Sequence, residues 1–481
     1  MKKMMMFGAA CAAMMNAWAV LEPAALFNDN MVLQREKSVA VWGKADPGAT
    51  VTIAFAGAEA KATADAKGAW RGNLPAMKAD GAGKVFTITS SSGEKVTYQN
   101  VVVGEVWLCG GQSNMTFQLW PAPRVFQHAG REKNGYYDMM LTDEPEIRGV
   151  WIGMRWSAQP GSMGRQQWLP FTPGATGNFS GAAFHYALRL HQALHIPVGV
   201  ISSAWGGSRI EPWIPASGFE QVPSVKALAT APIASKKKNA DLHQMARACW
   251  NAMIYPLAPY TLRGAIWYQG ESNRGEWNKY YDLLKALHAG WSKEFECPDM
   301  PFYLVQIAPY GYQPEAADPG ATQIREEMER FAYTEKNCGI AVISDVGEVD
   351  NIHPGDKRTV GTRLAALALN RLYGFTNLVC DAPKFKSASA VQNGRVTLTF
   401  DYVKAWNMNG LYPLRFELAG ADGKYEQVKA ELKGNTVQLL VPPNMKPTKV
   451  AYMRKSCWHG FLKNEAGLPL GPFRAELGCA K

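Results

Sequence analysis

The sequence predicts a multidomain protein of the α/β class, in which a mostly parallel central sheet is flanked by N- and C-terminal β-sandwich-type modules. The chain has 481 residues, which is too long for a single compact core. Between residues 104 and 374, apolar strands alternate with helical stretches, a pattern typical of a parallel sheet covered on both faces. Short alternating runs separated by turn residues occur before and after that region, and they favour β-sandwiches.

The first 19 residues have the pattern of a secretory signal peptide. Lys2 and Lys3 supply the positive end, and the apolar stretch 4–15 is too short to span a bilayer. Ala17-Trp18-Ala19 fits the small-x-small cleavage rule, so we expect the mature chain to begin at Val20. The protein is therefore predicted to be exported, either to the periplasm or into the medium.

The amino-acid composition limits the kinds of molecule that this protein is expected to bind. Apolar residues make up 47% and charged residues 19% of the chain, which is a globular composition. The formal net charge is +10 and falls to +8 without Lys2 and Lys3, but the basic residues are scattered. Nucleic-acid binding normally requires a basic stripe, so no nucleic-acid partner is expected. No later segment has the length and apolarity of a membrane span, and the sequence does not give the oligomeric state.

The cysteines do not predict a metal site. Eight cysteines become seven after signal cleavage, and none forms a C-x-x-C pair. We therefore expect neither a zinc site nor a thioredoxin-type site. One or more disulfides are compatible with an oxidising compartment, and the odd count leaves at least one thiol unpaired or bonded between chains.

Three regions follow from the order of the elements. An N-terminal β domain is predicted over residues 20–103, an α/β domain over 104–374 and a C-terminal β module over 375–481. Within the α/β domain, helices are expected over residues 181–194 and near 356–374, the second ending at Gly374. Buried strands are predicted within residues 101–109, 196–207, 262–272, 301–309 and 339–348.

A serine follows the first of these strands at a sharp Gly110-Gly111 turn. A nucleophilic serine needs such a place, because its hydroxyl is exposed at the strand end and nearby N–H groups are free to bind an oxyanion. The pattern G-x-S-x-G is nearly present, although Met115 stands in place of the last glycine. The loop alone equally favours a Ser113 that only caps the next helix.

His353 is the histidine that best fits a general base. It lies in "DVGEVDNIHPGDKRTVG", after one predicted strand and before a helix. Asp350 precedes it by three residues, so a short loop brings a carboxylate to the imidazole. The alternative is that Asp350 caps a turn and Pro354 starts the helix.

Oxyanion donors are available after two other predicted strands. In "AWGGSRIEPW", Gly206 and Gly207 offer backbone N–H groups, and in "WYQGESN" the side-chain amide of Gln269 or Asn273 is available. Each of these motifs alone is compatible with ordinary turn chemistry. Their joint occurrence after strands, together with Ser113 and His353, indicates an esterase-type site.

The motifs "GGQSNM", "SSAWGGSRIEPW", "WYQGESN" and "DNIHPGDKRTVGTRLA" together resemble the sialate O-acetylesterase family of the GDSL-like (SGNH) hydrolase superfamily. The likeness extends to "LFNDNMVLQRE" near the start and "GLPLGPFR" near the end. It implies an SGNH-hydrolase-like three-layer sandwich as the central fold. It also implies a serine esterase that needs no metal or organic cofactor.

The resemblance assigns roles to individual residues. It implies Ser113 as nucleophile, His353 as general base and Asp350 as its partner in an acyl-enzyme mechanism. It implies oxyanion donors at the N–H of Ser113, at Gly206 or Gly207, and at an amide of the third motif, where Gln269 is favoured over Asn273. Asp350 is the least secure of these assignments, because the superfamily includes members that work with a Ser–His pair.

The expected substrate is an O-acetylated sugar, first of all an O-acetylated sialic acid. Arg209 is expected to bind its carboxylate, with Arg155 as a second possibility. Trp205, with Trp120, Trp213 and Trp267, is available to stack on sugar rings, although each taken singly favours core packing. The alternatives are an esterase acting on acetylated xylan or another glycan, and a carbohydrate-binding protein without catalysis.

Overall fold

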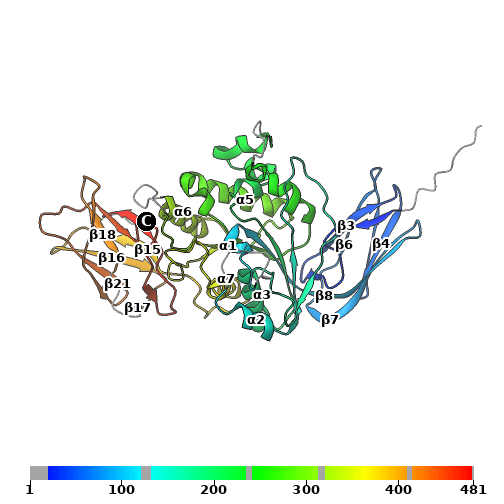
Figure 1. Cartoon of the computed structure of the whole chain (residues 1–481), viewed down its shortest axis with the longest axis horizontal. Helices are drawn as coiled ribbons and strands as arrows, with labels where there is room; N and C mark the ends of the chain where they lie inside the picture. The colour runs from blue at the N-terminus through cyan, green and yellow to red at the C-terminus, as the bar shows by residue number, and fades with distance from the viewer. Residues whose placement is uncertain (1–19, 121–131, 235–240, 313–319, 409–413, 479–481) are drawn as a thin grey trace, which may run out of the picture.

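The computed structural model describes residues 20–120, 132–234, 241–312, 320–408 and 414–478. The predicted signal peptide, residues 1–19, lies outside these ranges. Figure 1 shows a central α/β body with one β-module at each end of the long axis. The coarse prediction of an α/β centre with β-modules on both sides is confirmed.

The N-terminal module consists of two small sheets. Its buried side chains alternate along the strands, as at Val51, Ile53 and Phe55, so each sheet has one apolar face. One sheet contains β1 (Leu21–Pro23), β3 (Val39–Ala45) and β6 (Ala69–Leu74). The other contains β2 (Val32–Gln34), β4 (Thr50–Phe55), β5 (Ala58–Thr63), β7 (Asp80–Ser90) and the first half of β8 (Lys95–Gly111).

Strand β8 belongs to both the N-terminal module and the central sheet. Its first half pairs with β7 and β2, and its second half pairs with β11 and β12. The predicted boundary between residues 103 and 104 therefore falls inside one continuous strand. Next to it, the fully buried Glu105 binds Arg35 of the N-terminal module at 2.5 Å and Arg263 of the central domain at 2.7 Å.

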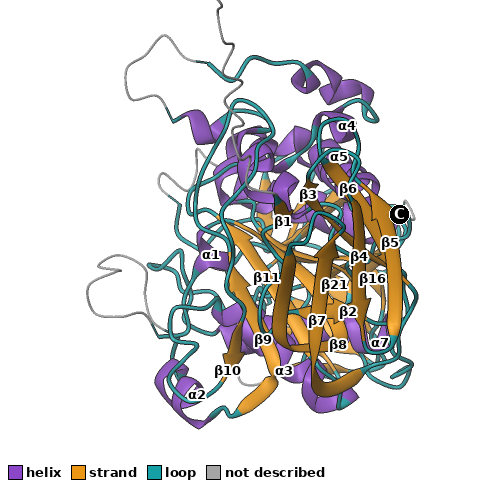
Figure 2. Cartoon of the chain, turned by 90° about the vertical axis from the view of Figure 1, so that its right-hand side faces the viewer, coloured by secondary structure: helices purple, strands orange, loops and turns teal. Residues whose placement is uncertain are grey.

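The central sheet has the order β10-β9-β11-β8-β12-β13-β14, and every neighbouring pair is parallel except β10 with β9. Figure 2 shows β9 and β11 side by side. The connection after β8 runs to one side of the sheet, to β9, and the connection after β12 runs to the other side, to β13. The carboxyl ends of β8 and β12 therefore flank a topological switch point, where ligands bind in open α/β sheets. The strands are β9 (Glu144–Trp151), β10 (Leu169–Phe171), β11 (Val198–Ala204), β12 (Gly264–Tyr268), β13 (Phe302–Val305) and β14 (Cys338–Ala341).

Helices cover both faces of this sheet. Alternate side chains of β8 point to opposite faces: Trp107 packs in one core with α3 and α7, and Leu108 packs in the other with α5 and α6. The longer helices are α3 (Gly181–Leu194), α5 (Tyr280–Glu294), α6 (Gly320–Thr334) and α7 (Lys357–Leu372). The shorter ones are α1 (Ser113–Thr116), α2 (Gly135–Leu141) and α4 (Ala216–Phe219). Both helices expected from periodicity are present, and α7 begins at an Asp356 N-cap.

The C-terminal module contains two four-stranded antiparallel sheets and one two-stranded sheet around one apolar core. Arg474 of this module binds Glu326 of α6 at 2.9 Å, which ties the module to the central domain. The strands are β15 (Lys384–Ala388), β16 (Arg395–Asp401), β17 (Trp406–Met408), β18 (Phe416–Ala419), β19 (Tyr425–Gln427), β20 (Ala430–Lys433), β21 (Thr436–Leu440), β22 (Lys449–Tyr452), β23 (Leu462–Asn464) and β24 (Phe473–Glu476).

Two sequence expectations concern the chain as a whole. The six cysteines within the described ranges are all free thiols, so the disulfides considered above are not found among them. Five of the six are buried. None of the helices in the described ranges combines the length and apolarity that a bilayer crossing requires.

Candidate active site

Ser113 lies at the carboxyl end of β8, where the sheet order reverses. It is half-buried and opens α1, whereas its neighbours Gln112 and Asn114 are buried. The preceding Gly111 has φ of +149°, and a Cβ there would lie 2.2 Å from the carbonyl oxygen of Tyr268. A glycine is needed for this turn because β8 and β12 approach so closely. The turn leaves Ser113 at the open edge of the sheet.

The loop after β11 lies against this serine. A Cβ built on Gly206 would be 3.6 Å from the Cβ of Ser113, and the N–H of Trp205 donates to Gly111 O at 3.1 Å. Gly206 and Gly207 are exposed, and Gly207 has φ of +75°. Among the described residues, the N–H groups of Ser113 and Gly206 have no hydrogen-bond partner. The structure therefore brings together two of the predicted oxyanion donors.

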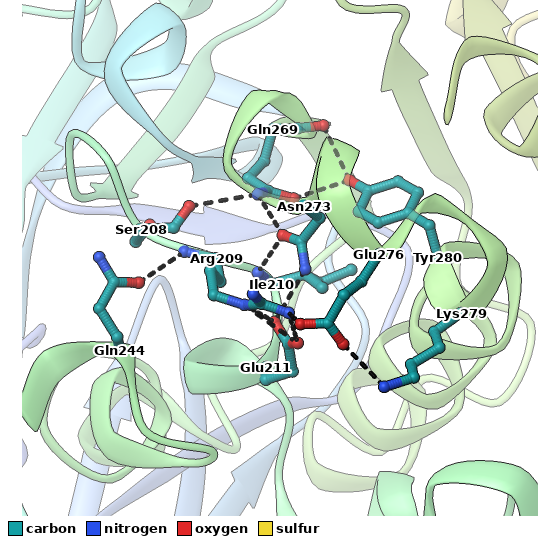
Figure 3. A network of polar contacts seen from close by, with 10 residues as sticks. All are labelled: Ser208, Arg209, Ile210, Glu211, Gln244, Gln269, Asn273, Glu276, Lys279 and Tyr280. Atoms are coloured by element: carbon teal, nitrogen blue, oxygen red, sulfur yellow. Dashed lines mark hydrogen bonds and ion pairs between the residues drawn. The ribbon is translucent and has the colours of Figure 1, made fainter. Parts of the chain in front are cut away.

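The predicted amide donors, Gln269 and Asn273, are instead committed to other partners. Gln269 is fully buried, and its Nε2 donates to Ser208 O at 3.2 Å and to Asn273 Oδ1 at 2.8 Å (Figure 3). Asn273, also fully buried, accepts from the N–H of Ile210. These amides brace the loop after β11 against the loop after β12. The sequence predicted these two amides as oxyanion donors because a motif shows neither the burial of a side chain nor its hydrogen-bond partners.

Arg209 is part of the same network. Its guanidinium pairs with Glu211 at 2.5 Å and with Glu276 at 2.9 Å, and Glu211 also accepts from Asn273 Nδ2 (Figure 3). Two carboxylates therefore already balance the one arginine charge. In this arrangement Arg209 holds the loop, and these contacts do not support the predicted role as receptor for a substrate carboxylate. Arg155, the second arginine considered, is exposed.

His353 follows β14 on a loop that meets the Ser113 loop. Asn114, next to the serine, donates through Nδ2 to Ile352 O, next to the histidine, at 3.0 Å. The His353 side chain is half-buried, and its backbone N–H donates to Asn351 Oδ1 at 3.0 Å. Burial lowers the pKa of His353, and the nearby Lys357 charge lowers it further. A histidine with a lowered pKa is neutral near pH 7, as a general base must be.

Asp350 is not joined to His353 in the structure. Its carboxylate is exposed, and neither a hydrogen bond nor an ion pair connects the two side chains within the described ranges. The carboxylate that braces this loop is Glu348, which accepts from the N–H of Gly355 at 3.1 Å and from Asn351 Nδ2 at 3.0 Å. The three-residue spacing is compatible with a contact between Asp350 and His353. In the structure, the carboxylate that accepts hydrogen bonds within this loop is that of Glu348.

The tryptophans near the motifs divide into two groups. Trp213 and Trp267 are fully buried and pack edge-to-face, so they belong to the core. Trp205 is half-buried and stacks on His243, with ring centroids 4.4 Å apart. It immediately precedes Gly206, which lies against Ser113. Trp120 is half-buried against Tyr136.

One cluster has the residue types of a metal site. Glu132, Asp138 and His185 bring ligand atoms within 4.8 Å of one another. His185 Nε2 is already hydrogen-bonded to Glu132 Oε1 at 2.7 Å, and Arg358 pairs with Asp138. Glu132 Oε2 and Asp138 Oδ2 are buried and have no hydrogen-bond partner among the described residues, so these contacts satisfy the cluster only in part.

Sequence reasoning missed the buried polar residues beneath the Ser113 and His353 loops. Asn114 donates to Glu271 Oε1 at 2.7 Å and accepts from Lys357 Nζ at 2.7 Å. All three residues lie inside the quoted motifs, but nothing in the order of residues marks them as buried or mutually bonded.

Comparisons with known proteins identify carbohydrate esterases. A family model described as "Carbohydrate esterase, sialic acid-specific acetylesterase" matches residues 103–370. The sialate O-acetylesterase of Pongo abelii is 31% identical over 75% of this chain and 72% of its own length. That of Rattus norvegicus is 30% identical, over 79% and 78%. The crystal structure of a carbohydrate acetylesterase from Xanthomonas citri superposes with a TM-score of 0.83 at 30% identity, covering 95% of this chain and 99% of that one.

Proposed function

The chain belongs to the carbohydrate esterase family of sialic acid-specific acetylesterases, and from this we propose that it removes acetyl groups from O-acetylated sialic acids. It is an esterase that hydrolyses acetyl esters of carbohydrates. This family membership excludes the alternative of a binding protein without catalysis. The finer assignments, to sialic acid and to particular catalytic residues, are proposals.

The proposed mechanism uses Ser113 as nucleophile and His353 as general base. Ser113 Oγ attacks the acetyl carbonyl while the imidazole takes its proton, and the sugar alcohol leaves with a proton returned by the imidazolium. Water, deprotonated by the same base, then hydrolyses the acetyl-enzyme. The N–H groups of Ser113 and Gly206 are the proposed oxyanion donors. The observation that carries this proposal is the meeting of three loops, seen in the Gly206–Ser113 approach and the Asn114–Ile352 hydrogen bond.

The remaining expectations from the sequence belong to the same proposal. We assign the central domain to the SGNH-hydrolase-like three-layer arrangement, and the strand order β11-β8-β12-β13-β14 with helices on both faces supports it. We also propose an exported enzyme, with residues 1–19 as its signal peptide. The positive end and the Ala17-Trp18-Ala19 site support this.

The activity is expected to persist at mildly acidic pH. A histidine base works only when neutral, and burial and Lys357 both lower the pKa of His353. The acid limb of kcat/KM should therefore lie below the ordinary histidine pKa of about 6.5. A pH profile with a soluble aryl acetate in constant-ionic-strength buffers measures this limb. A limb above 6.5 would contradict the proposed environment of the base.

A neutral glycan is the second substrate to consider, because Arg209 is engaged by Glu211 and Glu276. An enzyme for acetylated xylan would need no cation for a substrate carboxylate. In either case, we propose that the sugar stacks on Trp205, which lies beside Gly206 at the mouth of the site.

Acetate release distinguishes these substrates. Purified enzyme is incubated with O-acetylated sialic acid and, separately, with acetylated xylan at equal concentrations of acetyl ester. Higher kcat/KM on the sialic acid supports the main proposal, and higher kcat/KM on xylan replaces it with the alternative. Ser113→Ala is the blank for both reactions, and Trp205→Ala should raise KM for the preferred sugar more than for an aryl acetate.

A further inference from the structure

Lys357 is a fully buried lysine at the first turn of α7, close to both catalytic loops. Buried lysines are rare because removing an ammonium group from water is costly. This one donates to Asn114 Oδ1 at 2.7 Å and to Pro354 O at 2.8 Å. Its Nζ also lies 4.6 Å from the ring centre of Phe117. One acceptor therefore follows Ser113 in the chain, and the other follows His353.

The side chain of Asn114 is bonded to two further loops. Its Nδ2 donates to Glu271 Oε1 at 2.7 Å and to Ile352 O at 3.0 Å, while its Oδ1 accepts from Lys357. Asn114 is fully buried, and both its N–H groups are in use. Through these bonds, the residue after the nucleophile is fixed to the loop after β12 and to the residue before the base.

We propose that Lys357 and Asn114 act as a pair of positioning residues that hold the Ser113 loop against the His353 loop. This inference rests on the proposed roles of Ser113 and His353. Neither side chain is assigned any contact with substrate. Their effect is to fix the distance and direction between hydroxyl and imidazole, and a displacement of 1 Å in such a pair can lower the rate by about 10²-fold.

The charge of Lys357 adds a measurable signature to this role. Burial lowers the pKa of Lys357 to about 7 and raises the pKa of Glu271. The Lys357 charge in turn lowers the pKa of His353. An uncharged side chain that filled the same space would have no such influence on the base. The titratable groups that face Lys357 are Glu271, Glu132, Asp356, Glu348 and His353.

The test is a double-mutant cycle with Lys357→Met and Asn114→Ala, measured on an aryl acetate. Each single variant should lower kcat by about 10²-fold with little change in KM. The double variant should lose no more than the stronger single variant, because each substitution breaks the same connection. In Lys357→Met, the acid limb of kcat/KM should also move to higher pH, since a positive charge beside His353 is removed.

Lys37→Met is the matched control. Lys37 is half-buried and, like Lys357, donates to a backbone carbonyl, Leu262 O at 2.7 Å, but it lies at the junction with the N-terminal module. The Lys37→Met substitution should lower the melting temperature and leave kcat unchanged. If Lys357→Met does not fold, as judged by circular dichroism, kcat and KM of Asn114→Ala decide alone.

Three results would overturn the inference: kcat within threefold of the parent in a folded variant, a loss confined to KM, or losses that add in the double variant. The failure of the proposed function would be recognised separately, because Ser113→Ala would then remain active.

Discussion

Ser113→Ala is expected to lower kcat/KM for an aryl acetate by about 10⁴-fold or more while leaving the fold intact. The Ser113 hydroxyl is the proposed nucleophile, and an alanine side chain has no oxygen with which to form the acetyl-enzyme. Ser113 is half-buried and its side chain makes no hydrogen bond within the described residues, so its removal creates no buried unsatisfied partner. Residual hydrolysis above the uncatalysed rate should remain, because the oxyanion donors are backbone groups.

The measurement is the initial rate of chromophore release, with thermal unfolding followed on the same samples. Thr116→Ala is a useful control, because Thr116 lies on the same short helix and its hydroxyl bonds only to Ser113 O. It should retain most of the activity. A Ser113→Ala protein with activity within tenfold of the parent would remove the nucleophile from the proposal.

His353→Gln is expected to lower kcat/KM by about 10³-fold to 10⁴-fold, because the substitution removes the proposed general base. Glutamine keeps the approximate size and a hydrogen-bonding end, so the loop should survive. Asp350→Asn is expected to cost less than about tenfold. A carboxylate that orients a catalytic histidine is usually buried against it, whereas Asp350 is exposed and, among the described residues, makes no hydrogen bond or ion pair with His353.

The comparison of the two variants decides between a Ser–His pair and a full triad. A loss of about 10⁴-fold in Asp350→Asn would show that the loop rearranges to bring Asp350 to the imidazole during the reaction. A His353→Gln enzyme with nearly full activity would exclude His353 as the base. The pH profile gives an independent check, because the acid limb should disappear from whatever activity His353→Gln retains.

The fold was largely predictable because its signals are local. Each buried strand of the central sheet ends in a glycine-bearing or polar loop, and helix α3 matches the predicted range 181–194. Strand β9 was missed, since "EPEIRGVW" carries charges, a proline and a glycine and lacks a strand pattern. This segment forms a strand because it pairs with β11, which is distant in the sequence. A pattern of neighbouring residues does not show such a pairing.

The site was only partly predictable. The positions of Ser113 and Gly206 follow from strand ends that meet at one edge of a parallel sheet. The roles of three other residues depend on the groups that they contact across loops, and a motif does not show those partners. These residues are Gln269, Asn273 and Arg209. Lys357 and Glu271 were missed for the same reason, because charged residues are assumed to be exposed until packing proves otherwise.

The continuity of β8 bears on how this protein could have been assembled in evolution. The strand that ends just before Ser113, the proposed nucleophile, begins as a member of the N-terminal sheet, and Glu105 is held between Arg35 and Arg263 where the two parts merge. An appendage joined by a linker can be exchanged by recombination without disturbing its neighbour. Here an exchange would have to preserve the register of one shared strand, so the N-terminal module and the catalytic sheet are expected to be inherited together.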